Sequence, residues 1–170
     1  MIATFIFIIF PFAMIYAALS DIFTMTIANR ISLMLIAGFV AVAPFIGLSW
    51  SEFAWHWAAF ALVLTITFGL FAAGVMGGGD AKLMASTALW IGFNMQLLEY
   101  AIAFTVAGGL LTLMLILLRN SALATYVGEI RVLWRMLDEK DIPYGVALAI
   151  GGLTVFPETA AMQWAIAHTL

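Results

Sequence analysis

Two aspartates, Asp21 and Asp80, are the residues of this chain whose type and position could do chemistry. Each abuts a long apolar segment, and an ionisable group inside a bilayer costs about 2.5–3.5 kcal/mol at its centre. Two carboxyl groups a few ångströms apart cannot both ionise, so they share one proton. Such a pair can take a proton from a water that attacks a peptide carbonyl, and can then protonate the leaving amine. If the two aspartates converge, they predict the chemistry of an aspartic protease.

The positions of the two aspartates beside predicted helices suggest different roles for them. Asp80 directly precedes an apolar segment, and the N-terminus of a helix stabilises negative charge. Asp21 follows an apolar segment, and the C-terminus of a helix destabilises negative charge. We therefore predict that Asp80 is the ionised base and Asp21 the protonated acid, although the titration belongs to the pair. Taken alone, each has a simpler interpretation, Asp80 as an N-cap and Asp21 as an acid in an interfacial loop.

The residues around Asp80 favour a functional interpretation. Gly77, Gly78 and Gly79 precede it directly, and glycine has free access to positive φ. We expect an open loop that an extended substrate strand can approach closely. The alternative is a flexible loop plus helix packing, in which Gly74 and Gly78 form a small-xxx-small pair. Lys82 either tunes the carboxyl pair and contacts substrate, or anchors the chain at the membrane surface.

The composition requires elements that lie in a membrane. Of the 170 residues, 66% are hydrophobic and only 9% are charged, whereas a soluble domain is about 25% charged. The chain has no cysteine and only two histidines, so we predict neither a metal site nor a cofactor. With six basic residues and a net charge of −3, it lacks a basic patch for nucleic acid.

The aspartates must be positioned by apolar helices. We predict an all-α polytopic membrane protein with about six transmembrane helices, of which the fourth is short, because a span needs roughly 20 apolar residues. The predicted segments cover residues 2–19, 31–48, 53–75, 81–93, 97–118 and 142 onward, the last interrupted at Pro157.

The basic residues indicate the orientation. If the helices alternate, all six basic residues fall on one side of the membrane, and the opposite loops carry only acidic residues. Basic residues mark the cytoplasmic side, so we predict an N-terminus outside and both aspartates at the cytoplasmic membrane edge. The basic set is Arg30, Lys82, Arg119, Arg131, Arg135 and Lys140, and the opposing acids are Glu52, Glu99 and Glu158.

The longest loop contains a periodic apolar pattern. Val127, Ile130, Leu133, Trp134 and Leu137 recur at helical spacing. We predict an amphipathic helix near 121–139 on the cytoplasmic face; the alternative is a solvated connector. No internal repeat or second domain is visible, so residues 1–170 are predicted to form one membrane-embedded domain.

Three motifs resemble those of prepilin peptidases, the type IV leader peptidases among GxGD aspartic proteases. GGGDAKLMA at 77–85 resembles the signature GxGDxKLMA of that family, and Asp21 with Ile27-Ala28-Asn29 resembles D-x5-I-P-N. The sequence IPYGVA at 142–147 resembles the PYGxA element that opens the last helix. Asn29 is then expected to hold the first loop or to cap the second segment. The group Pro143, Tyr144 and Gly145 either positions the last helix or only starts it.

The resemblance implies an enzyme with Asp21 and Asp80 as its catalytic pair, and needing no cofactor. Its substrates would be type IV or Flp-type prepilins, which carry a short leader and a hydrophobic helix, cleaved at the cytoplasmic face of a bacterial inner membrane during pilus biogenesis or secretion. The bifunctional members of the family carry a cysteine-containing insertion, so N-methyltransferase activity is not expected of this chain. Ala28 replaces the family proline and should leave the first loop less rigid.

Two other classes of function remain open from the residues. A small transporter could use the aspartates as ion or proton sites and the glycines as a helix break. A non-catalytic pilus or secretion assembly subunit could use the aspartates as helix caps. A transporter often shows inverted repeats, which are not visible here, and a scaffold has no need of the combined motifs.

Overall fold

The computed structural model describes residues 1–121 and 142–169, and every regular element among them is a helix. The predicted all-α class is therefore confirmed. The predicted amphipathic helix near 121–139 lies, apart from its first residue, outside the described residues. The helices are α1 (Ile2–Thr24), α2 (Asn29–Val42), α3 (Trp50–Ala72), α4 (Gly78–Ile91), α5 (Met95–Arg119), α8 (Tyr144–Val155), the short 3-10 helix η1 (Phe156–Glu158) and α9 (Ala160–Ala167).

Among the residues that the structure describes, three helices, α1, α3 and α5, are long and apolar enough to cross a membrane. A fourth span is available if α8, η1 and α9 count as one, with a bend of 49°. Pro157 lies in η1 at this bend, as the interrupted last segment predicted. The helices α2 and α4 have 14 residues each, or about 21 Å, less than the roughly 30 Å of a bilayer core. The count of six spans stays a prediction.

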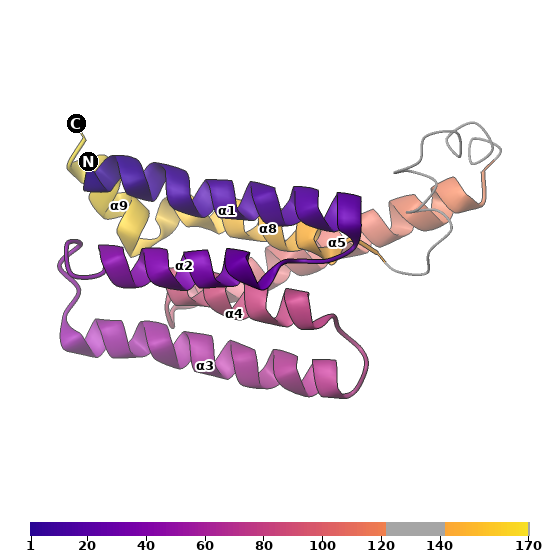
Figure 1. Cartoon of the computed structure of the whole chain (residues 1–170), viewed down its shortest axis with the longest axis horizontal. Coiled ribbons are helices and arrows are strands. Elements are labelled where there is room, and N and C mark those ends of the chain that lie inside the picture. The colour runs from indigo at the N-terminus through magenta and orange to yellow at the C-terminus, as the bar shows by residue number, and fades with distance from the viewer. Residues whose placement is uncertain (122–141, 170) are drawn as a thin grey trace.

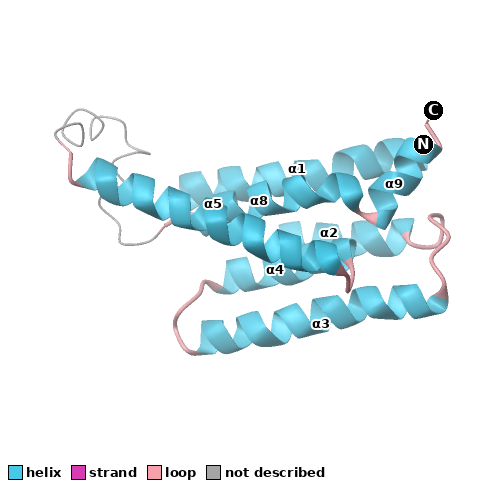
Figure 2. Cartoon of the chain, turned by 180° about the vertical axis from the view of Figure 1, so that it is seen from behind, coloured by secondary structure: helices cyan, strands magenta, loops and turns pink. Residues whose placement is uncertain are grey.

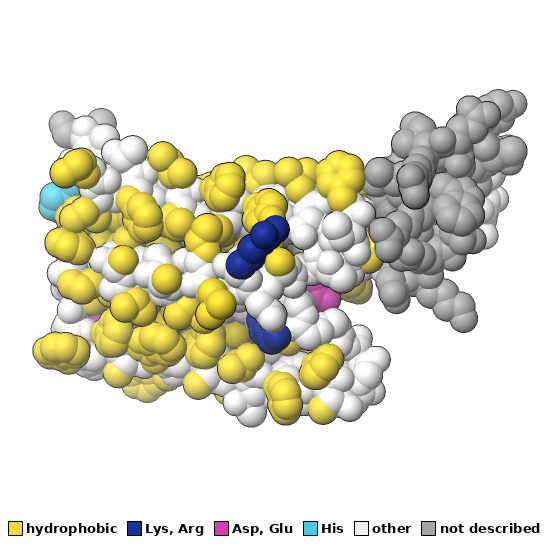
Figure 3. All heavy atoms as spheres, in the orientation of Figure 1, with side chains coloured by type: hydrophobic (Ala, Val, Ile, Leu, Met, Phe, Trp, Pro, Cys, Tyr) yellow, Lys and Arg dark blue, Asp and Glu magenta, His cyan; other side chains and the backbone are white. Residues whose placement is uncertain are grey.

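The helices run alternately along one axis, so their ends gather at two poles (Figure 1, Figure 2). At one pole α1, α3 and α5 end while α2, α4 and α8 begin; we call it the aspartate end, since Asp21 and Asp80 lie in those terminal turns. The chain termini lie at the opposite end. Apolar side chains cover the face formed by α1, α2 and α3, with basic side chains toward the aspartate end (Figure 3).

The centre of the bundle is α4. Its residues from Leu83 to Ile91 are all buried, and it packs against α3, α2 and α8. A helix that is apolar on every side belongs inside a protein. Trp90 anchors it: its indole N–H donates to the carbonyl of Leu35 at 2.8 Å, and its ring meets those of Phe10 and Phe39. This fixed helix carries Asp80 in its first turn.

Two predicted helix boundaries next to the aspartates are wrong. The helix α1 continues past Asp21 to Thr24, and α4 begins at Gly78, ahead of Asp80. Both carboxyl groups therefore project from helical turns. Backbone hydrogen bonds continue a helix through polar residues as well as apolar ones. A boundary predicted from the end of an apolar segment therefore misses the polar turns of the helix.

Candidate active site

A cavity of about 500 Å³ at the aspartate end contains both aspartates. Its walls come from the end of α1, the α3–α4 connection, the first turns of α4 and α8, and the middle of α5. Most of the remaining lining is apolar: Met25, Val75, Met76, Met84, Phe104, Ile142, Tyr144 and Leu148. The fold thus brings two residues that are distant in sequence to one partly open cavity.

Asp21 lies in the last turn of α1 and is only 6% exposed. Its Oδ2 accepts a hydrogen bond from the backbone N–H of Gly145 at 2.6 Å. Gly145 is the second residue of α8, whose N-terminal N–H groups have no partner within the helix. The Asp21 carboxylate therefore fills a position where a helix attracts negative charge.

Asp80 is half-buried in the first turn of α4. The backbone N–H of Gly77, the N-cap residue, donates to its carboxylate, and the charge of Asp21 acts on Asp80 electrostatically. Both carboxyl groups thus lie at a helix N-terminus, Asp80 on its own helix and Asp21 against α8. From the sequence we assigned Asp80 as base and Asp21 as acid, because we expected them at opposite kinds of helix end. In the structure both lie at a helix N-terminus, so this argument does not distinguish their roles.

The glycine run does not form the open loop that we expected. Gly77 has φ −70°, Gly78 and Gly79 lie within α4, and none of the three has a positive φ. They are needed for close approach instead. A Cβ on Gly79 would lie 3.1 Å from both the Cβ and the carbonyl oxygen of Ile27. Gly79 is therefore required for the first loop to lie directly on the start of α4, whereas Gly74, which the packing alternative paired with Gly78, lies in a turn with φ 72° and nothing within 4 Å of its Cβ position.

Lys82 and Asn29 bind each other. The Nζ of Lys82 donates to Oδ1 of Asn29 at 2.9 Å, across 53 positions of sequence. Asn29 is the first residue of α2 and makes no cap hydrogen bond, because Ala28 is the N-cap. The expectation that Asn29 caps this helix is wrong, and its side chain ties the first loop to α4.

The group Pro143, Tyr144 and Gly145 forms the start of α8 beside the cavity. Pro143 is the buried N-cap residue, and Tyr144 is 42% exposed and lines the cavity. The Tyr144 ring packs on Gly108 of α5, where a Cβ would lie 3.0 Å from its Cε1. The element that resembled PYGxA therefore begins the helix and also forms part of the site.

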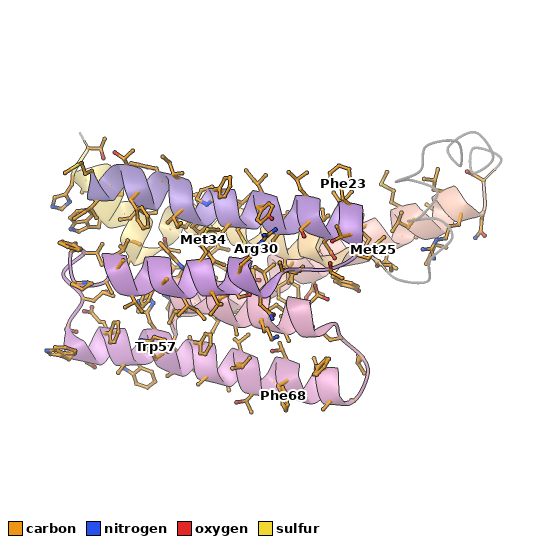
Figure 4. The ribbon with its side chains drawn as sticks, viewed as in Figure 1. Phe23, Met25, Arg30, Met34, Trp57 and Phe68 are labelled. Atoms are coloured by element: carbon orange, nitrogen blue, oxygen red, sulfur yellow. The ribbon has the colours of Figure 1, made fainter. Side chains whose placement is uncertain are left out.

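Some of the apolar residues lining the cavity were not singled out from the sequence. Phe104 and Leu148 look like any other residues of apolar helices, whereas Met84 belongs to the GGGDAKLMA motif and Tyr144 to the IPYGVA motif. Met25 differs from the other lining residues in its backbone, because it ends α1 with φ 51° and turns the chain near Asp21. Figure 4 shows Met25 just beyond α1 and Arg30 at the start of α2 on the side facing α1, where Arg30 bonds to the hydroxyl of Tyr16.

Metal ligation has no obvious donor set in the part of the chain that the structure describes. Among those residues, no three His, Cys, Asp or Glu side chains are grouped so that they could hold an ion. The cavity offers two carboxyl groups, each held by a backbone N–H, with apolar walls around them. That arrangement presents two acids in one cavity with mostly apolar walls.

Comparison with known protein families identifies a family for most of the chain. The profile of the Type IV leader peptidase family matches residues 8–127. The matched region contains Asp21, Asp80 and Lys82, and ends before the start of α8. No curated protein and no solved structure matches the chain.

Proposed function

The chain belongs to the Type IV leader peptidase family, and we propose that it is a membrane aspartic endopeptidase that removes the leader of type IV or Flp-type prepilins. Asp21 and Asp80 are its catalytic pair in this proposal. The observation that carries it is the single cavity in which both carboxyl groups lie, each with a backbone N–H partner. The family supplies the general reaction, and the cavity supplies the candidate residues.

The proposed mechanism uses one proton shared between the two carboxyl groups. Gly145 occupies Oδ2 of Asp21, which leaves Oδ1 for a water molecule. The ionised carboxylate takes a proton from this water as its oxygen attacks the peptide carbonyl. The protonated carboxyl group donates to the developing oxyanion, and a proton then passes to the leaving amine as the C–N bond breaks. The apolar walls strengthen these interactions by lowering the local dielectric.

We place the aspartate end at the cytoplasmic face of a bacterial inner membrane. Arg30, Lys82 and Arg119 all lie near helix termini at this end, and basic residues favour the cytoplasmic side. A prepilin would then keep its leader in the cytoplasm and its hydrophobic helix in the bilayer. The reaction needs no cofactor, and we propose no methyl transfer, since the chain has no cysteine-containing insertion.

Co-expression with a candidate prepilin tests this function. Asp21→Asn and Asp80→Asn should each reduce leader removal about 10²–10⁴-fold, the usual share of a general acid or base. Glu99→Gln is the matched control, because Glu99 is an exposed acid in α5 outside the cavity. The measurement is the mobility shift of the pilin, with the amount of membrane-inserted enzyme determined in parallel.

Two results would contradict the proposal. Undiminished cleavage in either asparagine variant would remove that residue from the catalytic pair. A wild-type chain that inserts correctly but leaves every prepilin intact would favour the transporter or assembly interpretation. In the transporter case, proton or ion flux in vesicles should depend on the same two aspartates.

A further inference from the structure

We propose that Ile27 and the Lys82–Asn29 hydrogen bond form a spacer that sets the distance between Asp21 and Asp80. The inference rests on the proposed function, because it makes Ile27 and Lys82 positioning residues for that reaction. It assigns a role to the first loop, residues 25–28, and to Lys82, for which the sequence left open a role beside the carboxyl pair or an anchor at the membrane surface.

The packing around the two aspartates shows why a spacer is needed. The helix α1, which carries Asp21, packs against α2 and α8, and both of those pack against α4, which carries Asp80. The first loop is the segment that leads from α1 into α2. The relative placement of the two carboxyl groups therefore depends on α2 and α8, beside the direct contacts of α1 with α4 at Phe10 and Trp90 and at Met14 and Thr87.

Ile27 lies between the two helix starts that hold the acids. It is 9% exposed, and its atoms stand 3.1 Å from the Cβ position of Gly79 and 3.0 Å from that of Gly145. Gly79 directly precedes Asp80, and Gly145 donates the N–H that binds Asp21. One side chain thus separates the backbones on which both carboxyl groups depend, and the two glycines give it room.

The hydrogen bond between the exposed side chains of Lys82 and Asn29 holds Ile27 in this position. Lys82 is two positions after Asp80, and residues two apart on a helix do not face each other. The lysine reaches Asn29, two residues after Ile27, at 2.9 Å. Its charge is directed to α2, so its part in the reaction is to fix the loop against α4.

Kinetics of purified enzyme in nanodiscs give the first readout. A displacement of about 1 Å at reacting groups costs up to 10²-fold in rate. Lys82→Met should lower kcat about 10- to 100-fold with little change in KM, and Lys82→Arg, which can still donate to Asn29, should restore most of it. Asn29→Leu should match Lys82→Met, and the double variant should be no worse than either.

Ile27→Ala should have the same kinetic effect as the loss of the lysine. Its matched control is Ile6→Ala, which removes the same atoms from a fully buried site in α1 toward the opposite end. That control should reduce thermal stability and leave kcat per folded enzyme unchanged. Equal loss of kcat in both variants would show a general packing effect and overturn the role of Ile27.

Crosslinking reports the spacing without any catalysis. The chain has no cysteine, so Asp21→Cys with Asp80→Cys introduces a single thiol pair. A short bifunctional thiosulfonate should join the pair several-fold more slowly when Lys82→Met is added, and Lys82→Arg should restore the rate. A crosslinking rate that is independent of Lys82 overturns the spacer even if kcat falls. A rate that depends on Lys82 supports the spacer even if the prepilin experiment fails, so the two proposals fail separately.

Discussion

At the end of the bundle opposite the aspartates, polar side chains complete the hydrogen bonds of helix ends. Ser49 and Glu52 form a reciprocal capping box at the start of α3. Thr159 accepts from the N–H of Met162 at the start of α9. The buried Nδ1–H of His56 donates to the carbonyl of Leu89 at 2.7 Å, in the last turn of α4. Each of these groups has a structural explanation.

At the aspartate end the polar side chains also bind the ends of helices, but capping does not account for their arrangement. The carboxylates of Asp21 and Asp80 accept backbone N–H groups from Gly145 and Gly77, as the side chain of a helix cap does. Here, however, the two acids face a shared cavity and act on each other electrostatically. A helix cap has no need of a second acid beside it, and two carboxylates at one site cannot both ionise without cost. Capping and hydrogen bonding account for the polar groups at one end, and the pair of acids at the other end is where we propose the function lies.

Outside the two aspartates themselves, the largest expected effect on the rate of cleavage is at Gly145. A Cβ there would lie 2.9 Å from both Cβ and Oδ2 of Asp21, so Gly145→Ala must displace the carboxylate or α8. We expect leader cleavage to fall about 10²-fold, the cost of roughly 1 Å of misplacement. The measurement is kcat on a prepilin with folded enzyme quantified. Gly109→Ala, in α5 with nothing within 4 Å of its Cβ position, should keep full activity.

His56 gives the corresponding test at the opposite end. His56→Phe keeps the ring but leaves the buried Leu89 carbonyl without its donor, and should lower the free energy of unfolding by about 1–3 kcal/mol. The rate of cleavage per folded molecule should not change. Unfolding in mixed micelles and prepilin cleavage are measured on the same preparations. The exposed His168 is the control, since His168→Phe should stay within about 0.5 kcal/mol; a loss of kcat in His56→Phe alone would break the division between the two ends.

Much of the difference between the two ends of the bundle could be predicted from the sequence. Apolar segment lengths gave the helical class and separated Asp21 and Asp80 from the loop charges, because burying an acid beside such segments is costly. The boundaries were harder. The second apolar segment extends through Leu48, but α2 ends at Val42 and the turn that follows contains Pro44 and Gly47. Hydropathy does not distinguish an apolar helix from an apolar turn.

The contacts that complete the site could not be predicted. The donor to Asp21 is a backbone N–H, 124 positions away, on a residue with no side chain. The partner of Lys82 is 53 positions away in another motif. Glycines 77 to 79 allow either a positive φ or a close approach, and the structure shows close approaches to Asp80 at Gly77, to Phe71 at Gly78 and to Ile27 at Gly79. Such choices depend on tertiary packing, which local sequence does not contain.

A smaller effect is expected at the capping box of α3. Ser49→Ala removes the acceptor for the Glu52 N–H, a contact of 3.2 Å, and should lower the free energy of unfolding by about 1 kcal/mol. Ser51→Ala, one residue into the helix, should change it by no more than a few tenths. Cleavage per folded enzyme should be the same in both. Unequal kcat values would mean that this end also contributes to the reaction.

The smallest expected effect lies in the first loop, at Ala28. Its φ of −68° and ψ of 136° fit proline, and its N–H donates no hydrogen bond among the described residues. Ala28→Pro should therefore stabilise the fold by about 0.4–1 kcal/mol through the unfolded chain, and kcat should be kept. Ala37→Pro, inside α2, should cost about 3 kcal/mol. A loss of stability or of kcat in Ala28→Pro would mean that Ile27, directly before it, must leave the extended backbone that proline enforces, and the rigid spacer would then be the wrong description of this loop.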